Sequence, residues 1–337
     1  MRLAARVGMA GMMLLTGATT PGQGYHLFRR VPLAGPVRWD YLALDPDRRR
    51  LFIAHDTVVT VVDPDWLTVT AYIPGTQGVH GIALAPDLGR GFASDGRDAT
   101  VTSFDLATLR VVGRIRVTGR NPDAIAYDSV SRRVFTFNGG SDDATAIDAE
   151  RGAVAGTLPL GGRPEFAVAD GRGRMFVNLE DRDSLLEFDA RTLKPVARWA
   201  LAPCGAPSAL AMDRARRLLF VGCRNRLLAV VDANRGSVLN TLPIGAGVDG
   251  VVFDPATREV LSASGDGTLT VAAPDSAGHY RVAATVPTER GARTLAFDPG
   301  TRRIFLVTAT FAPPPAGAPG ARPEAVPGTF ALLVYAP

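Results

Sequence analysis

A tandem repeat runs through almost the whole chain and limits the folds that it can adopt. In seven segments an apolar run ends at an aspartate or an alanine, a short turn follows, and a second apolar run begins. The residues that end the first runs are Asp45, Ala85, Asp128, Asp170, Asp213, Asp254 and Asp298, 40 to 44 residues apart. A second set repeats with the same period: Asp63, Asp105, Asp148, Asp189 and Asp232. Two independent landmarks with one period indicate a structural repeat.

Each repeat has room for four short strands. Turn-forming residues divide it into four apolar or alternating runs, and no repeat carries an apolar pattern of helical period. A four-stranded unit that recurs every 40–45 residues is typical of a β-propeller blade, whereas a β-solenoid has a shorter period and lacks hairpin turns. The sequence therefore predicts an all-β fold, a seven-bladed β-propeller of four-stranded antiparallel blades that forms a single domain over residues 25–337.

The two ends of the chain are expected to share one blade. The last repeat stops after its third run, residues 329–335, and the spare run at residues 25–33 resembles the fourth runs of the other repeats. An N-terminal strand that completes the last blade would close the ring and remove two exposed sheet edges.

Residues 1–24 have the order of a secretory signal peptide and a short leader. Arg2 and Arg6 precede an apolar stretch at residues 7–15, and small residues end it at Ala18. That stretch is shorter than the ~20 residues that span a bilayer, so no transmembrane anchor is expected. The alternative is a disordered or helical N-terminus of a cytosolic protein. The leader favours a periplasmic or secreted protein.

Several segments resemble the YVTN, or YncE-like, seven-bladed propellers of exported bacterial proteins. These segments are NPDAIAYD (121–128), RPEFAVAD (163–170), MFVNLEDRDS (175–184), VDGVVFDP (248–255), SASGDGTLTV (262–271) and RGARTLAFDP (290–299). HDTVVTVVD (55–63) departs from the pattern because it lacks the usual asparagine. The resemblance implies the fold and an extracytoplasmic location, but it implies no reaction.

The repeat register places seven polar residues around one end of the predicted channel. They stand five positions before the anchors: Asp40, His80, Asp123, Glu165, Ser208, Asp249 and Arg293. The following turns on the same face add a rim of His55, Asp95, Asn138, Asn178 and Asp266, and Trp39 offers an apolar wall. Two interpretations stay open. The ring binds a ligand, or its short polar side chains only bind loop amides and channel waters.

The carboxylates of this ring suggest a metal. Asp40, Asp123, Glu165 and Asp249 would supply the oxygen ligands that Ca²⁺ or Mg²⁺ prefers. No other cofactor is indicated by the sequence.

The two cysteines, Cys204 and Cys223, belong to loops that emerge on the same face of the fifth blade. In an exported protein this predicts a disulfide, and two unpaired buried thiols are the alternative. A proline-rich insertion at residues 311–328 lies in the last blade on the face of the acidic ring. It is either a lid or docking strip or a plain surface loop.

The composition and the motifs limit the range of possible functions. The net charge is +4 and the arginines are spread along the chain, so no specific nucleic acid is indicated. No HExxH, CxxC, GxSxG, SxxK or Walker motif occurs. We expect a monomeric binding or interaction module whose channel mouth holds a small molecule, a cation or a protein segment. The alternative is a metal-assisted hydrolase or lyase of the propeller lactonase type, in which a cation polarises a carbonyl and His80 or a carboxylate moves a proton.

Overall fold

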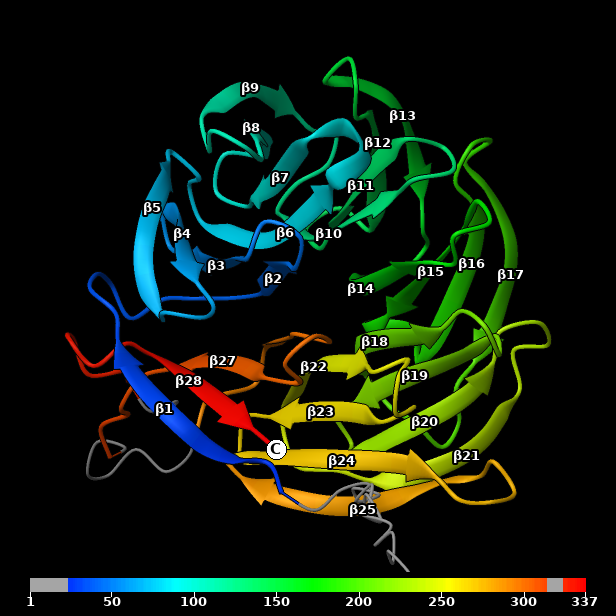
Figure 1. Cartoon of the computed structure of the whole chain (residues 1–337). Coiled ribbons are helices and arrows are strands. Elements are labelled where there is room, and N and C mark those ends of the chain that lie inside the picture. The colour runs from blue at the N-terminus through cyan, green and yellow to red at the C-terminus, as the bar shows by residue number, and fades with distance from the viewer. Residues whose placement is uncertain (1–23, 314–323) are drawn as a thin grey trace, which may run out of the picture.

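The computed structural model describes residues 24–313 and 324–337. The expected signal segment at residues 1–23 and the centre of the proline-rich insertion at residues 314–323 lie outside these ranges. Seven four-stranded sheets form a closed ring of blades (Figure 1). The predicted seven-bladed β-propeller of antiparallel blades is therefore confirmed.

Each blade is an antiparallel meander that starts with the strand nearest the ring axis. Blades one and two contain β2 (Leu42–Asp45), β3 (Arg50–His55), β4 (Val58–Asp63), β5 (Thr68–Pro74), β6 (Val79–Ala85), β7 (Arg90–Asp95), β8 (Thr100–Asp105) and β9 (Val111–Arg116). Blades three and four contain β10 (Pro122–Asp128), β11 (Arg133–Asn138), β12 (Asp143–Asp148), β13 (Ala153–Pro159), β14 (Pro164–Ala169), β15 (Arg174–Leu179), β16 (Ser184–Asp189) and β17 (Lys194–Ala200). Blades five and six contain β18 (Pro207–Asp213), β19 (Leu218–Cys223), β20 (Leu227–Asp232), β21 (Val238–Pro243), β22 (Val248–Phe253), β23 (Val260–Ser264), β24 (Thr268–Pro274) and β25 (Tyr280–Pro287).

The seventh blade joins the two ends of the chain, as the sequence predicts. It contains β26 (Leu295–Phe297), β27 (Ile304–Thr308), β28 (Ala331–Ala336) and β1 (His26–Pro32). The strand β1 pairs antiparallel with β28, with Arg30 opposite Leu333 (Figure 1). This pairing provides hydrogen-bond partners for the edge of β28, whose backbone groups would otherwise be free to pair with another chain.

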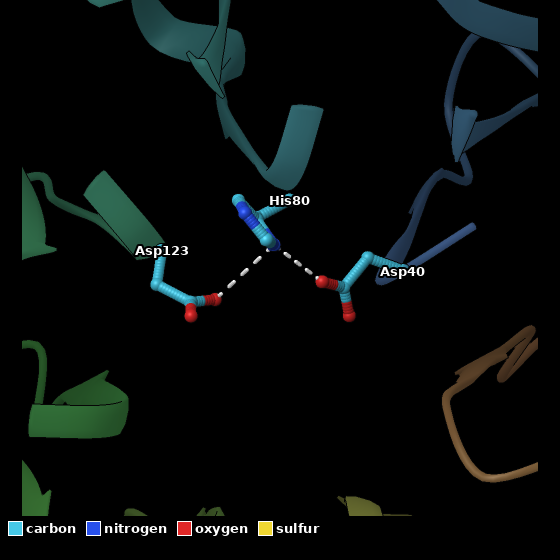
Figure 2. Close-up of side chains that lie close together, drawn as sticks. All are labelled: Asp40, His80 and Asp123. Carbon is cyan, nitrogen blue, oxygen red and sulfur yellow. Dashed lines mark hydrogen bonds and ion pairs between the residues drawn. The ribbon is translucent and has the colours of Figure 1, made fainter. Parts of the chain in front are cut away.

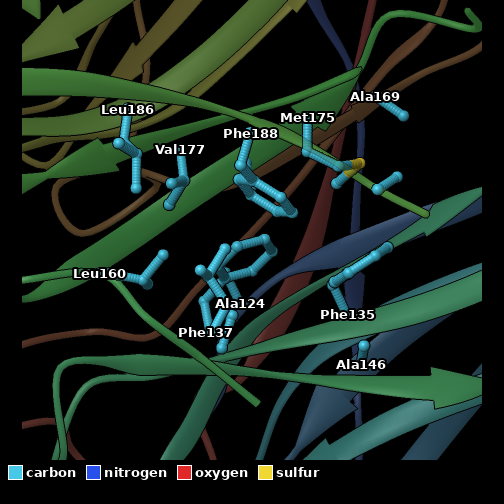
Figure 3. Close-up of a cluster of buried hydrophobic side chains, with 14 of the residues drawn as sticks. Ala124, Phe135, Phe137, Ala146, Leu160, Ala169, Met175, Val177, Leu186 and Phe188 are labelled. Carbon is cyan, nitrogen blue, oxygen red and sulfur yellow. The ribbon is translucent and has the colours of Figure 1, made fainter. Parts of the chain in front are cut away.

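The core lies between neighbouring blades. Every residue of β11 after Arg133 is buried, because the adjacent blades cover both faces of the middle strands. Between blades three and four, Phe135 and Phe137 pack against Phe188, with ring centroids 5.5 and 6.4 Å apart (Figure 3). Burial of a large apolar side chain of this kind contributes about 1.5–3 kcal/mol.

Arginines in the turns between the first and second strands tie neighbouring blades together. Arg49, Arg217 and Arg302 adopt a left-handed backbone conformation, with φ of 50°, 57° and 57°. Each side chain reaches the buried anchor aspartate of the preceding blade: Asp298, Asp170 and Asp254, respectively. The basic turns that the sequence shows therefore serve as contacts between blades.

Two single-turn 3-10 helices interrupt the strand pattern, η1 (Pro86–Leu88) and η2 (Glu180–Arg182). Cys204 and Cys223 form the predicted disulfide, with their Cα atoms 5.7 Å apart. Within the part of the chain that the structure describes, no helix is both long and apolar enough to cross a membrane.

Candidate functional site

The seven predicted ring residues stand at equivalent places on the inner strands. His80, Asp123, Glu165, Ser208 and Asp249 are the second residues of β6, β10, β14, β18 and β22. Asp40 and Arg293 come two residues before β2 and β26. Because successive blades repeat the same register around the axis, residues of this set approach one another although they are about 40 positions apart in sequence.

Three of these residues form one cluster. His80 Nδ1 lies 2.6 Å from Asp40 Oδ2 and 3.7 Å from Asp123 Oδ1 (Figure 2). The three side chains come from blades two, one and three, and each is 17–25% exposed. The cluster is thus open to solvent on one side and held by protein on the other.

Burial and mutual repulsion shift the titration of this cluster. Burial raises the pKa of Asp123 to about 7, and the charges of Asp40 and Asp249 add to the effect while His80 opposes it. Burial disfavours the charged form of His80, but the hydrogen bond to Asp40 and the nearby carboxylates outweigh it and raise its pKa above the ordinary value. These shifts indicate that negative charge at the mouth is only partly compensated.

The other two ring carboxylates are paired with arginines. Asp249 accepts a hydrogen bond from Arg293 Nε at 2.7 Å, and Glu165 accepts one from Arg224 Nη2 at 2.9 Å. Burial nevertheless raises the pKa of Glu165 to about 8 and that of Asp249 to about 6. Both arginines are about half exposed, so their compensation is screened by water.

The structure adds three charged residues that the repeat register did not single out. Glu180, which opens η2, is buried, accepts a hydrogen bond from Arg163 and forms an ion pair with Arg224, whose Nε lies 2.7 Å from Glu180 Oε1. Around the mouth the carboxylates of Asp40, Asp123, Glu165, Glu180 and Asp249 therefore face the cations Arg163, Arg224, Arg293 and His80. When all five carboxyl groups are ionised, they outnumber these four basic groups even with His80 protonated; Arg38, whose charge also acts on His80, pairs with Asp56 at 3.9 Å.

Tyr41 closes the bottom of the mouth. Its ring, from blade one, meets the ring of Phe166, from blade four, edge to face with centroids 5.1 Å apart. Burial raises the pKa of Tyr41 well above its ordinary value, and the charges of Asp249, Asp40, Asp123 and Glu165 raise it further. All four ring carboxylates therefore act on this one phenol.

The residue types that follow the ring positions are consistent with Tyr41 and Phe166 closing the bottom of the mouth. The seven residues that directly follow the ring positions are Tyr41, Gly81, Ala124, Phe166, Ala209, Gly250 and Thr294. Five are small and two are aromatic. A Cβ atom at Gly81 would lie 2.8 Å from Ile125 and one at Gly250 2.4 Å from Leu295, so the inner strands approach closely at this level. The two aromatic rings fill the space that remains.

Beneath Tyr41 and Phe166 the ring axis contains a cavity of about 670 Å³. Its wall is mainly apolar and comes from all seven inner strands. The repeat register predicts the polar mouth, but it does not predict the apolar channel below it.

The rest of the predicted set makes contacts with neighbouring blades and loops. Ser208 is buried and donates to Val248 O at 2.8 Å. His55 Nε2 lies 2.6 Å from Pro36 O, and its Nδ1 lies 3.1 Å from Thr60 Oγ1. Trp39 stacks on Phe330, with ring centroids 5.4 Å apart.

The remaining rim residues bond to neighbouring strands, turns and blades. Asp95 is buried and accepts from Thr102 Oγ1 at 2.6 Å, and burial raises its pKa to about 7. Asn138 donates to Asp143 at 2.6 Å, and Asn178 donates to Ala209 O at 3.1 Å. Asp266 accepts from the backbone amide of Ala246 at 2.6 Å.

Two of the four predicted metal ligands, Asp40 and Asp123, lie beside His80. One ligand atom from each of Asp40, His80 and Asp123 lies within 4.8 Å of the others. Glu165 and Asp249 belong instead to the arginine pairs described above. A set of one imidazole and two carboxylates suits Zn²⁺ or Mn²⁺ better than Ca²⁺, which prefers oxygen ligands alone.

Comparison with known proteins identifies the architecture. No family model matches the sequence, and no curated protein matches it. The fold is similar to a chain of the mitotic checkpoint complex, with 14% identity, 99% of each chain covered and a TM-score of 0.75. It is similar to the WD40 repeats of RRP9, with 9% identity over 93% of this chain and 100% of that one, and a TM-score of 0.78. Hydrazine synthase of Kuenenia stuttgartiensis matches with 16% identity over 88% of this chain and 96% of that one, and a TM-score of 0.70. These likenesses show the fold alone.

Proposed function

We propose that this protein is an exported propeller of the YVTN, or YncE-like, type that binds an organic cation at its channel mouth. The ligand is an ammonium or guanidinium group, carried by a small molecule or by a lysine or arginine of a protein segment. One observation carries the proposal: carboxylates from blades one, three, four and six face a single mouth whose floor is the aromatic ring of Tyr41. The export and family assignments rest on the leader and on the repeat motifs.

The chemistry of the mouth favours a cation in two ways. Acidic groups outnumber basic ones there, and burial raises the pKa values of Asp123 and Glu165 to about 7 and about 8. A bound cation would restore the ionised form of both groups and would exchange repulsion for attraction. An aromatic face beside carboxylates is also a recognised receptor for alkylated ammonium groups.

A second candidate function rests on the cluster of Asp40, His80 and Asp123. Three ligand atoms within 4.8 Å could hold a divalent ion with open coordination positions. Such an ion would polarise a carbonyl in a hydrolase or lyase of the propeller lactonase type, and His80 or a carboxylate would then move a proton.

A thermal-shift series separates the two functions. The first arm tests putrescine, arginine amide and tetramethylammonium, and the second tests Ca²⁺, Zn²⁺ and Mn²⁺ with a chelator control. Stabilisation by an organic cation that is lost in Asp123→Asn/Glu165→Gln supports the binding module. Asp98→Asn, which removes an exposed acid from the second blade, is the matched control. A shift with Zn²⁺ or Mn²⁺ alone, lost in His80→Gln, would favour the enzyme and refute the binding module.

A further inference from the structure

The axial cavity is a separate compartment from the acidic mouth. It begins beneath Tyr41 and Phe166 and continues to the turns between the first and second strands on the opposite face, where Ala215 and Pro255 line it. Its wall includes the side chains of Leu44, Ile125, Val168, Met212, Val251 and Phe297. Leu44, Val168, Met212 and Phe297 are half-buried, so apolar surface inside the ring remains uncovered by protein. Apolar cavities of this kind favour apolar ligands over water.

Two charged residues line the far end of the cavity: Arg214, which is exposed, and Asp213, which is buried and paired with Arg216. The residues that directly follow the seven anchors are Pro46, Pro86, Ser129, Gly171, Arg214, Pro255 and Pro299. Arg214 is exposed and lines the cavity. The apolar channel thus ends at a rim of proline and small residues with a single guanidinium.

The guanidinium of Arg214 is fixed by one hydrogen bond, and its terminal N–H groups remain available as hydrogen-bond donors. Arg214 Nε donates to Ala169 O at 3.0 Å, which fixes the side chain over the junction of blades four and five. Among residues 24–313 and 324–337, Arg214 has no acidic partner. The buried Asp213 beside it pairs with Arg216, 3.2 Å away. The two terminal nitrogens of Arg214 can therefore receive an anionic group.

We propose that the axial channel binds a single-chain amphiphile with an anionic head. The hydrocarbon chain enters from the turn face and lies along the apolar wall, and the head group stays at the rim against Arg214. A carboxylate or a phosphate monoester would fit this position. Tyr41 and Phe166 keep the chain apart from the acidic mouth, so the two sites are occupied independently.

The test measures displacement of a dansyl-labelled undecanoate probe, below the micelle concentrations of the competitors. Dodecanoate and dodecyl phosphate should compete with one site per chain, and the tighter of the two identifies the head group. Dodecanol and dodecylamine should bind at least tenfold more weakly, because they lose the charge-assisted hydrogen bonds to Arg214.

Three variants complete the test. Arg214→Gln should weaken dodecanoate binding about tenfold or more, whereas Arg172→Gln, an exposed arginine in the neighbouring turn, should leave it unchanged. Val168→Phe adds bulk to the wall and should also weaken binding, with its melting temperature showing that it is folded. Asp123→Asn should have no effect, so this result is independent of the mouth. Failure of dodecanoate to displace the probe, or equal binding of dodecanol and dodecanoate, would overturn the proposal.

Discussion

Tyr41 of the first blade meets Phe166 of the fourth across the ring axis, with their ring centroids 5.1 Å apart. Blades one and four are as far apart around a seven-membered ring as two blades can be. Their contact therefore spans the channel and divides it into a polar mouth and an apolar cavity. The residues that directly follow the ring residues thus separate the polar mouth from the apolar cavity.

The stability of the protein should fall as the pH rises through the pKa of Glu165. Burial raises that pKa to about 8, so the folded state holds a proton that the unfolded state releases near its ordinary value of 4.5. The stabilisation is complete below the unfolded pKa and is lost as the pH rises towards 8. Relative to wild type, Glu165→Gln should gain up to about 1.4 kcal/mol of unfolding free energy for each pH unit crossed. Urea unfolding at pH 5 and pH 8 measures this, and profiles that stay parallel would show that Glu165 titrates normally.

Arg217 should stabilise the ring far more than Arg151, whose ion pair lies at the surface. The side chain of Arg217 is 14% exposed and pairs with Asp170, which is 1% exposed, in the preceding blade. Arg217→Gln would leave that carboxylate buried without its cation, at a cost of roughly 3 kcal/mol. Arg151 is 83% exposed and pairs with the partly exposed Asp148 of its own turn, so Arg151→Gln should cost less than about 1 kcal/mol. Urea unfolding of both variants measures the difference, and equal losses would contradict a role for Arg217 between blades.

Closure of the ring by β1 should be required for a monodisperse protein. Deletion of residues 25–33 removes β1 and leaves the backbone groups of β28 unpaired. We expect the truncated chain to aggregate in size-exclusion chromatography with light scattering. A monomeric truncated protein with the melting temperature of the full chain would show that the seventh blade is stable with three strands.

The disulfide should contribute about 3 kcal/mol to stability. Cys204 and Cys223 close a loop of 19 residue steps, and a loop of this length removes that much chain entropy from the unfolded state. Treatment with dithiothreitol should lower the melting temperature of wild type and leave Cys204→Ala/Cys223→Ala unchanged. Two free thiols in protein purified under oxidising conditions would contradict the bridge.

The fold was predictable because the sequence of each blade repeats the same pattern of apolar runs, turns and anchor residues. The spacing of Asp45, Asp128 and the other anchors gives the blade length, and the spare run at residues 25–33 indicates the closure. The cluster of Asp40, His80 and Asp123 follows from the same register.

The partners of the ring could not be predicted in the same way. Arg224 and Glu180 lie in turns of different blades, and their pairing depends on how far long side chains reach across the mouth. The metal ligands expected at Glu165 and Asp249 are engaged by arginines for the same reason. The repeat register predicts where the backbone of each blade lies. Which charged groups form ion pairs depends in addition on the length and conformation of their side chains.

Calorimetric titration of arginine amide into the protein at pH 7, in two buffers with different enthalpies of ionisation, tests the acidic mouth most directly. At this pH Glu165 is largely protonated and Asp123 is partly protonated, because burial raises their pKa values to about 8 and about 7. We expect saturable binding at one site with release of protons to the buffer, retained in Asp98→Asn and lost in Asp123→Asn/Glu165→Gln. Absence of binding, or binding without proton release that survives the double substitution, would contradict it.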